Sequence, residues 1–195
     1  MRQRACLAAG MAAIVVLSSC VPVLSLHALY TAKDIVAQPQ LLGKWMGEDD
    51  TEKVQLEIAQ GEGKCYALTL TDNSKTPGEQ DSFNGCAVKL GARTFFDLEQ
   101  TDVSVGGEGN IMWLAIPAHM LGKFHIEGDT LTFSFLDDDW VKGQIQAGKL
   151  PLKMEIIENT PVFTGPTAQI QEYVRAHADD EKAFSDTFTF HRAKP

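Results

Sequence analysis

Histidine is the residue type in this chain best suited to bind a metal ion or to exchange protons near neutral pH. The five histidines lie at positions 27, 119, 125, 177 and 191. No two of them have the i, i+4 spacing of a helical metal site, and the motif H-E-x-x-H is absent. His119 and His125 could meet across a bend in the chain, but a zinc site needs further ligands. The spacing therefore predicts separate surface or helix-capping histidines and no metal site.

Acidic and glycine-rich stretches are also weak candidates for chemistry. The aspartates at 137–139 lack the spaced oxygens and the glycine of a calcium loop, so we expect them to begin a helix. We expect the acidic run at 179–181 to be a solvated helix end. The glycines within 105–110 form neither a phosphate-binding loop nor a dinucleotide-binding turn, and G-x-S-x-G and S-x-x-K are absent. We therefore predict no enzyme and no cofactor, with an unrecognised hydrolase as a weak alternative.

One of the four cysteines lies in a context that predicts covalent lipid attachment. A short basic segment, residues 1–4, precedes an apolar stretch over 5–17 with the length of a signal-peptide core. It leads into Leu17-Ser18-Ser19-Cys20, which resembles the lipobox of bacterial lipoproteins. The resemblance implies that residues 1–19 are a signal peptide, that Cys20 carries the acyl chains, and that 20–29 form a lipidated tether. The alternatives are an uncleaved leader, or ordinary cleavage near a cysteine that is there by chance.

The residue after that cysteine and the charge of the chain bear on where the protein works. Val21 stands where an aspartate would retain a lipoprotein at the inner membrane, so the resemblance implies the outer membrane, facing the periplasm. Loss of residues 1–19 removes two arginines and no acid, which takes the net charge from −9 to −11. This acidity argues against nucleic acid as a partner and against adhesion to an anionic membrane through charge. Acyl chains would then hold the domain at the membrane, and no protein partner is indicated.

Cys65 and Cys86 would remain as a pair in an oxidising compartment, where disulfides persist. Each lies in a strand-like run, and the turn-forming segment 72–78 separates the two runs. A hairpin centred on that turn would place the cysteines opposite each other. A redox or metal role is the alternative, but the spacing is not C-x-x-C and no histidine is close in sequence. We predict a structural disulfide.

Short strands dominate the rest of the chain, at the spacing typical of a barrel or sandwich. Alternating and apolar runs predict strands at 54–58, 65–71, 83–90, 94–98, 111–116, 123–127, 131–136, 153–157 and 187–190. Helices are expected after residue 31, over 140–147 and from 166 to about 178. No linker or repeat divides the chain. The fold prediction is a single domain over 30–195, mainly β (α+β), with an antiparallel barrel of about eight strands and two peripheral helices.

The start of this strand series carries a resemblance to a known family. Gly43-Lys44-Trp45 resembles the G-x-W entry of lipocalins, in which the tryptophan closes one barrel end beneath an arginine near the last strand; Arg192 could be that partner. The stretches 29–34, 42–45, 138–140 and 177–184 are similar to a family of uncharacterised bacterial lipoproteins with a lipocalin-like (calycin) barrel. The resemblance implies this fold and a location, and no catalytic residues. The inserted helices and the Cys65–Cys86 pair depart from the lipocalin pattern, which leaves open whether the barrel is closed.

Aromatic side chains could either fill such a barrel or line a cavity within it. We name Trp113, Phe133 and Phe135 as candidate ligand-binding residues. A cavity predicts non-catalytic binding of a small apolar or amphipathic molecule, which is the leading hypothesis. A filled interior predicts a structural or protein-interaction lipoprotein of the envelope, which is the alternative.

Overall fold

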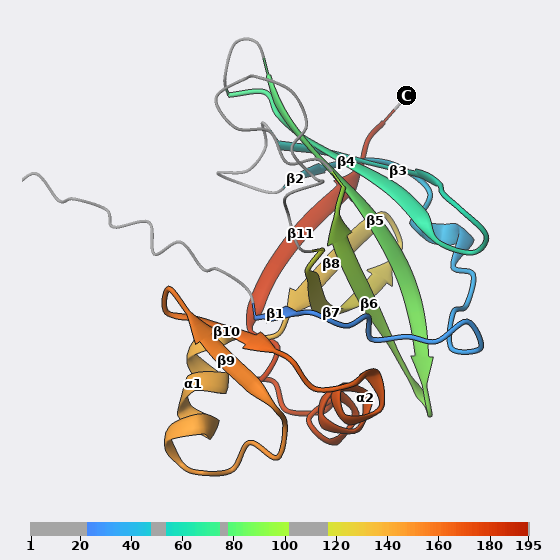
Figure 1. Ribbon diagram of the computed structural model, residues 1–195. Helices are drawn as coiled ribbons and strands as arrows, with labels where there is room; N and C mark the ends of the chain where they lie inside the picture. The colour runs from blue at the N-terminus through green and yellow to red at the C-terminus, as the bar shows by residue number, and fades with distance from the viewer. Residues whose placement is uncertain (1–22, 48–53, 75–77, 102–116, 195) are drawn as a thin grey trace, which may run out of the picture.

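Eight antiparallel strands close into a barrel in the computed structural model, which describes residues 23–47, 54–74, 78–101 and 117–194 (Figure 1). The barrel strands are β2 (Gly43–Gly47), β3 (Val54–Gln60), β4 (Tyr66–Asp72), β5 (Glu79–Leu90), β6 (Arg93–Gln100), β7 (His119–Glu127), β8 (Thr130–Phe135) and β11 (Asp186–Arg192). Each strand from β2 to β8 pairs with the next one along the chain, and β11 pairs with both β8 and β2. The prediction of an eight-stranded antiparallel barrel is confirmed, and the barrel is closed.

Alternation of side chains along each strand builds the barrel interior, because successive residues of a strand point to opposite faces. On β4, Tyr66 and Leu68 are buried in the inner core, whereas Ala67 between them is exposed. The inner core contains the following buried side chains: Leu41, Trp45, Leu56, Ile58, Tyr66, Leu68, Ala87, Phe96, Leu98, Leu131, Phe133 and Phe190.

A second core lies outside the barrel, where two helices and three short strands pack below it in Figure 1. These elements are β1 (Leu24–Ser25), α1 (Asp138–Gln146), β9 (Met154–Ile157), β10 (Thr160–Phe163) and α2 (Thr167–Ala176), and a 3-10 turn, η1 (Pro39–Leu41), precedes β2. Val88, Phe95 and Leu121 of the barrel wall share this core with Ile170 and Val174 of α2. β1 pairs antiparallel with β7 and parallel with β10, and so joins the small sheet to the barrel.

The two late helices were predicted, and each begins as its sequence indicates. The Asp137 carboxylate caps α1 by accepting a hydrogen bond from the Trp140 backbone N–H at 2.6 Å. The prediction of a helix after residue 31 is wrong. Thr31 donates from its backbone N–H and its hydroxyl to the Asp34 carboxylate, but only a turn forms, because the chain then pairs with β5 through the bridge between Ile35 and Val88.

Two segments of the structure differ from the sequence prediction, and a third predicted segment lies outside the described residues. Residues 23–29, which we expected to belong to a tether, lie in the fold: Val23 and Leu29 are fully buried and β1 is a sheet strand. β10 was not predicted, because a proline within a run argues against a strand; β1 pairs with it only at Val162 and Phe163, beyond Pro161. The strand expected at 111–116 lies outside the described residues.

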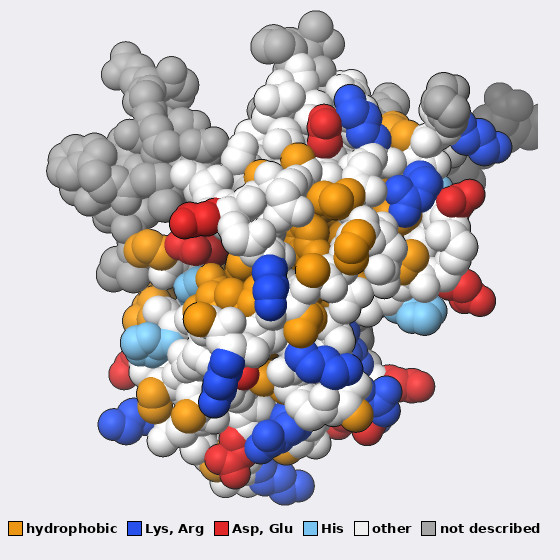
Figure 2. Space-filling model, turned by 90° about the vertical axis from the view of Figure 1, so that its right-hand side faces the viewer, with side chains coloured by type: hydrophobic (Ala, Val, Ile, Leu, Met, Phe, Trp, Pro, Cys, Tyr) orange, Lys and Arg blue, Asp and Glu red, His pale blue; other side chains and the backbone are white. Residues whose placement is uncertain are grey.

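Charged side chains of both signs are interspersed around a band of apolar side chains on the face shown in Figure 2.

Candidate ligand-binding site

A cavity of about 210 Å³ lies inside the barrel. Every described side chain that lines it is apolar, and β3, β4, β5, β6, β7, β8 and β11 all contribute: Leu56, Leu68, Leu70, Phe83, Phe96, Leu98, Met120, Phe133, Phe135, Phe188 and Phe190. These lining residues offer contact with apolar groups, and none of the described ones has a side chain that could act as nucleophile, acid or base.

Two glycines on the inner face of the wall let aromatic rings lie close against it. A Cβ atom at Gly85 would come within 2.5 Å of the Phe96 ring, and one at Gly122 would come within 3.0 Å of the Phe135 ring. Because the backbone itself accommodates these rings, they line the wall of the barrel and leave space beside them. The cavity thus depends on where glycine occurs as much as on where phenylalanine occurs.

In the part of the chain that the structure describes, the cavity opens at the barrel end where β4 ends and β5 begins. Leu70, Phe83, Met120 and Phe135 are half-buried there, and Phe188 is 47% exposed although it lines the cavity. The Phe135 ring lies 6.0 Å from Phe188 and 6.2 Å from Phe133, within the range of favourable aromatic contacts. A row of aromatic rings therefore leads from the surface into the barrel.

Trp45 and Arg192 lie together at the other end of the barrel. The Trp45 indole N–H donates to the Leu41 carbonyl at 2.9 Å, and the Arg192 guanidinium lies 4.1 Å above the indole. Arg192 also donates to the carbonyls of Leu42 and Gln40, at 3.1 and 3.0 Å. Gly43 has a φ of +132°, and a Cβ there would lie 3.0 Å from Arg192 Nη1. The structure thus brings together Gly43, Trp45 and Arg192, the three residues that the resemblance implied would close the barrel.

The structure places two of the three candidate ligand-binding residues in the cavity wall, Phe133 and Phe135. Trp113 lies outside the described residues. Sequence reasoning did not name the other lining residues. Part of this set can be read from the alternation along a strand. Leu68 and Leu70, for example, lie two residues apart on β4 and so point to the same face of the barrel wall.

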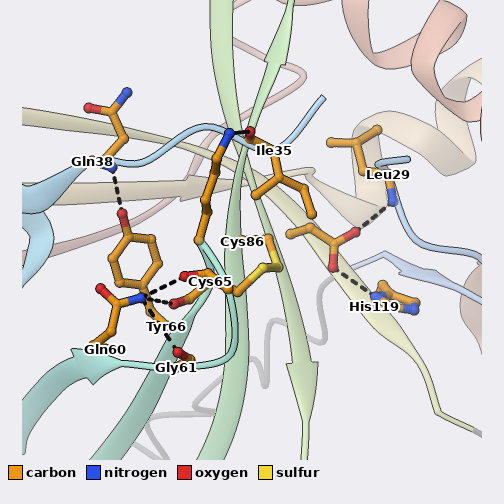
Figure 3. Close-up of a disulfide and its surroundings, with 12 residues drawn as sticks. Leu29, Ile35, Gln38, Gln60, Gly61, Cys65, Tyr66, Cys86 and His119 are labelled. Atoms are coloured by element: carbon orange, nitrogen blue, oxygen red, sulfur yellow. Dashed lines mark hydrogen bonds and ion pairs between the residues drawn. A yellow bond between two sulfur atoms is a disulfide. The ribbon is translucent and has the colours of Figure 1, made fainter. Parts of the chain in front are cut away.

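Buried polar residues lie outside the barrel wall, beneath the N-terminal segment. The Asp97 carboxylate accepts the Leu29 backbone N–H at 2.6 Å, and its other oxygen lies 2.7 Å from His119 Nδ1 (Figure 3). Asp97 and His119 are 2% and 8% exposed. The expectation of a surface or capping histidine at 119 is wrong, because residues 23–29 cover this part of β7.

Ser25, Asp97 and His119 are the residue types of a hydrolytic triad, but their described hydrogen bonds serve another purpose. The Ser25 hydroxyl donates to the His27 carbonyl at 2.6 Å and accepts the His27 N–H at 3.2 Å. Ser25 is fully buried. The Ser25 contacts lie within the N-terminal segment, whereas the bond from the Leu29 N–H to Asp97 holds this segment against the barrel.

Cys65 and Cys86 form a disulfide on the outer wall, as predicted, with a Cα–Cα distance of 4.5 Å (Figure 3). It lies where β5 changes partners. β5 pairs with β4 as far as Gly85, and beyond it the Val36 N–H donates to the Ala87 carbonyl and the Lys89 N–H to the Asp34 carbonyl. The disulfide therefore fixes the point at which β4 diverges from β5 and the N-terminal segment replaces it.

In the part of the chain that the structure describes, no three histidine, cysteine, aspartate or glutamate side chains are grouped as metal ligands. None of the helices described is both long and apolar enough to cross a bilayer. A scan against protein-family models, a search of curated proteins and a search of solved structures each find no match.

Proposed function

We propose that this protein binds a small apolar or amphipathic molecule inside a lipocalin-like barrel, without catalysis. In this proposal, acyl chains on Cys20 hold the barrel at the outer membrane, facing the periplasm. The observation that supports binding is the cavity of about 210 Å³, which among the described residues is lined only by apolar side chains and is open at one end.

The size of the cavity limits the ligand. An engineered cavity of about 150 Å³ binds benzene, and sites for drug-sized ligands span about 300–1,000 Å³. A cavity between these limits suits one ring system or a short acyl chain. The polar part of an amphipathic ligand would stay at the open end, since a polar group buried without a hydrogen-bond partner is unfavourable.

Filling the cavity is expected to weaken binding. Leu70 lines the cavity and is half-buried near its open end, so Leu70→Trp adds an indole where a ligand would enter. With 1-naphthylamine, a fluorescent apolar probe of one ring system, we expect the Kd to rise at least about tenfold, which corresponds to about 1.4 kcal/mol. Ala67→Trp is the matched control, because Ala67 lies on the outer face of the same strand and is exposed.

The control decides how the result is interpreted. An equal loss in both variants would place the probe on the outer surface, and an unchanged Kd in Leu70→Trp would exclude the barrel cavity as its site. If the wild-type domain binds neither the probe nor any lipid, the alternative of a structural or protein-interaction lipoprotein is favoured.

The lipid anchor has a separate test. Cys20→Ala removes the only thiol in the lipobox-like sequence. We expect this variant to move from the membrane fraction to the soluble periplasmic fraction, because acyl chains rather than charge would hold this acidic protein. Membrane retention of Cys20→Ala would contradict the anchor and leave ligand binding untouched.

A further inference from the structure

The end of β9 exposes two adjacent isoleucines. Ile156 and Ile157 are 49% and 56% exposed, and they are two of the four large hydrophobic residues that are exposed in the described part of the chain. They precede a two-residue turn, Glu158 and Asn159, whose φ values of 47° and 71° are typical of a tight hairpin. We call residues 156–159 the hairpin tip. Exposed apolar groups that gather at one projecting point are a candidate contact surface.

The register of the small sheet relates this tip to the start of the described chain. β10 begins directly after the turn, and β1 runs parallel to it, with Leu24 beside Val162 and Ser25 beside Phe163. The chain before Leu24 therefore leads back toward the end of the sheet at which β9 and β10 are joined. In Figure 1 the start of β1 lies next to this hairpin.

The distance to the proposed anchor is short. Only Val21 and Pro22 separate Cys20 from Val23, which is fully buried. Three extended residues span at most about 11 Å, so a lipid-bearing Cys20 must lie within that distance of the Val23 Cα atom. A domain held this closely cannot stand far from its bilayer, and the end of the small sheet at which β1 begins must lie near the surface.

We infer that the hairpin tip inserts Ile156 and Ile157 into the surface of the bilayer that carries the anchor; this rests on the proposed lipid anchor at Cys20. Apolar side chains that insert in this way lie at the boundary between the lipid headgroups and the acyl chains, about 5–10 Å into the membrane. Glu155 is exposed beside them and Glu158 is exposed in the turn, so these carboxylates stay in the headgroup layer, the two isoleucines alone make the apolar contact, and anionic lipid adds nothing to it. Two points of attachment, anchor and tip, then set the orientation of the barrel on the membrane.

A fluorescent label tests the insertion in the full lipidated protein. Loss of residues 1–19 would remove Cys6, and the other native cysteines are occupied by the proposed lipid and by the disulfide, so a new cysteine in Ile157→Cys can be labelled alone with a nitrobenzoxadiazole dye. We compare lipidated protein in phosphatidylcholine vesicles with the soluble form that also carries Cys20→Ala. We expect emission to rise about threefold or more in vesicles, because the dye leaves water for the apolar boundary. Ala92→Cys is the control, since Ala92 is exposed at the β5–β6 turn, and its emission should not change.

The outcomes separate the two proposals. If the protein does not associate with vesicles, the anchor fails. If it associates and the label at 157 behaves like the label at 92, the anchor stands and insertion of the tip is overturned. Far-ultraviolet circular dichroism on each labelled protein verifies that the barrel is retained.

Discussion

Replacing Asp97 with alanine is expected to lower the free energy of unfolding by about 3–5 kcal/mol, as for other buried ion pairs that lose one partner. Asp97 is 2% exposed and bonds to both His119 and the Leu29 N–H. Its removal leaves a buried imidazole without its partner and a buried backbone donor unsatisfied, and each is unfavourable. Urea unfolding followed by circular dichroism measures the change.

A local effect should accompany the global one. Without the Asp97 carboxylate, residues 23–29 lose a main attachment to the barrel, so limited proteolysis should cut this segment first. Glu127→Ala is the control: its carboxylate is 88% exposed on β7, and the change should stay within about 0.5 kcal/mol. A loss below about 1 kcal/mol in Asp97→Ala would show that the pair does not hold the segment.

The same pair makes stability depend on pH. Burial lowers the pKa of His119, but the hydrogen bond to Asp97 and the charges of Asp97 and Glu99 outweigh it, so the pKa is raised above its ordinary value. The folded state therefore holds this proton more tightly than the unfolded state does. The contribution to stability is complete below about pH 6.5, the ordinary pKa, and is lost as pH rises through the raised value. We expect His119→Gln to lack this pH dependence.

Removing the disulfide is the second large effect. The cysteines are 21 residues apart, and closing a loop of this size contributes about 3 kcal/mol, mainly by restricting the unfolded chain. The double variant Cys65→Ser with Cys86→Ser should lose that amount in urea unfolding. Reduction of the wild-type protein should match it. A loss below about 1 kcal/mol would mean that the β4–β5 hairpin restricts the unfolded chain without the bond.

Local patterns allowed much of this fold to be predicted. Alternation on β3 and β4, the antiparallel pairing of the two cysteine strands and the aspartate cap of α1 are all indicated by features within a few residues, and all appear in the structure. The short β1 and β10 have too few residues to show alternation. β1 pairs with β7 and with β10, and both of these strands are far from β1 in the sequence.

From the sequence, a cavity was one of two possibilities for the barrel interior, and an interior filled by side chains was the other. Whether aromatic side chains fill a barrel depends on which residues face their rings, and that requires the strand register. Gly85 lies beside Leu98 and Gly122 beside Phe96 only once β5, β6 and β7 are paired. The buried position of His119 was missed for a similar reason, since residues 23–29 come to cover it from the other end of the chain.

Native mass spectrometry of the protein, extracted from the membranes of its own host in a mild detergent, tests ligand binding most directly. The cavity of about 210 Å³ predicts one small apolar or amphipathic molecule that is released on activation, is retained by Ala67→Trp and is lost from Leu70→Trp. A barrel that is empty in every preparation, or an adduct that persists unchanged in Leu70→Trp, would contradict the account.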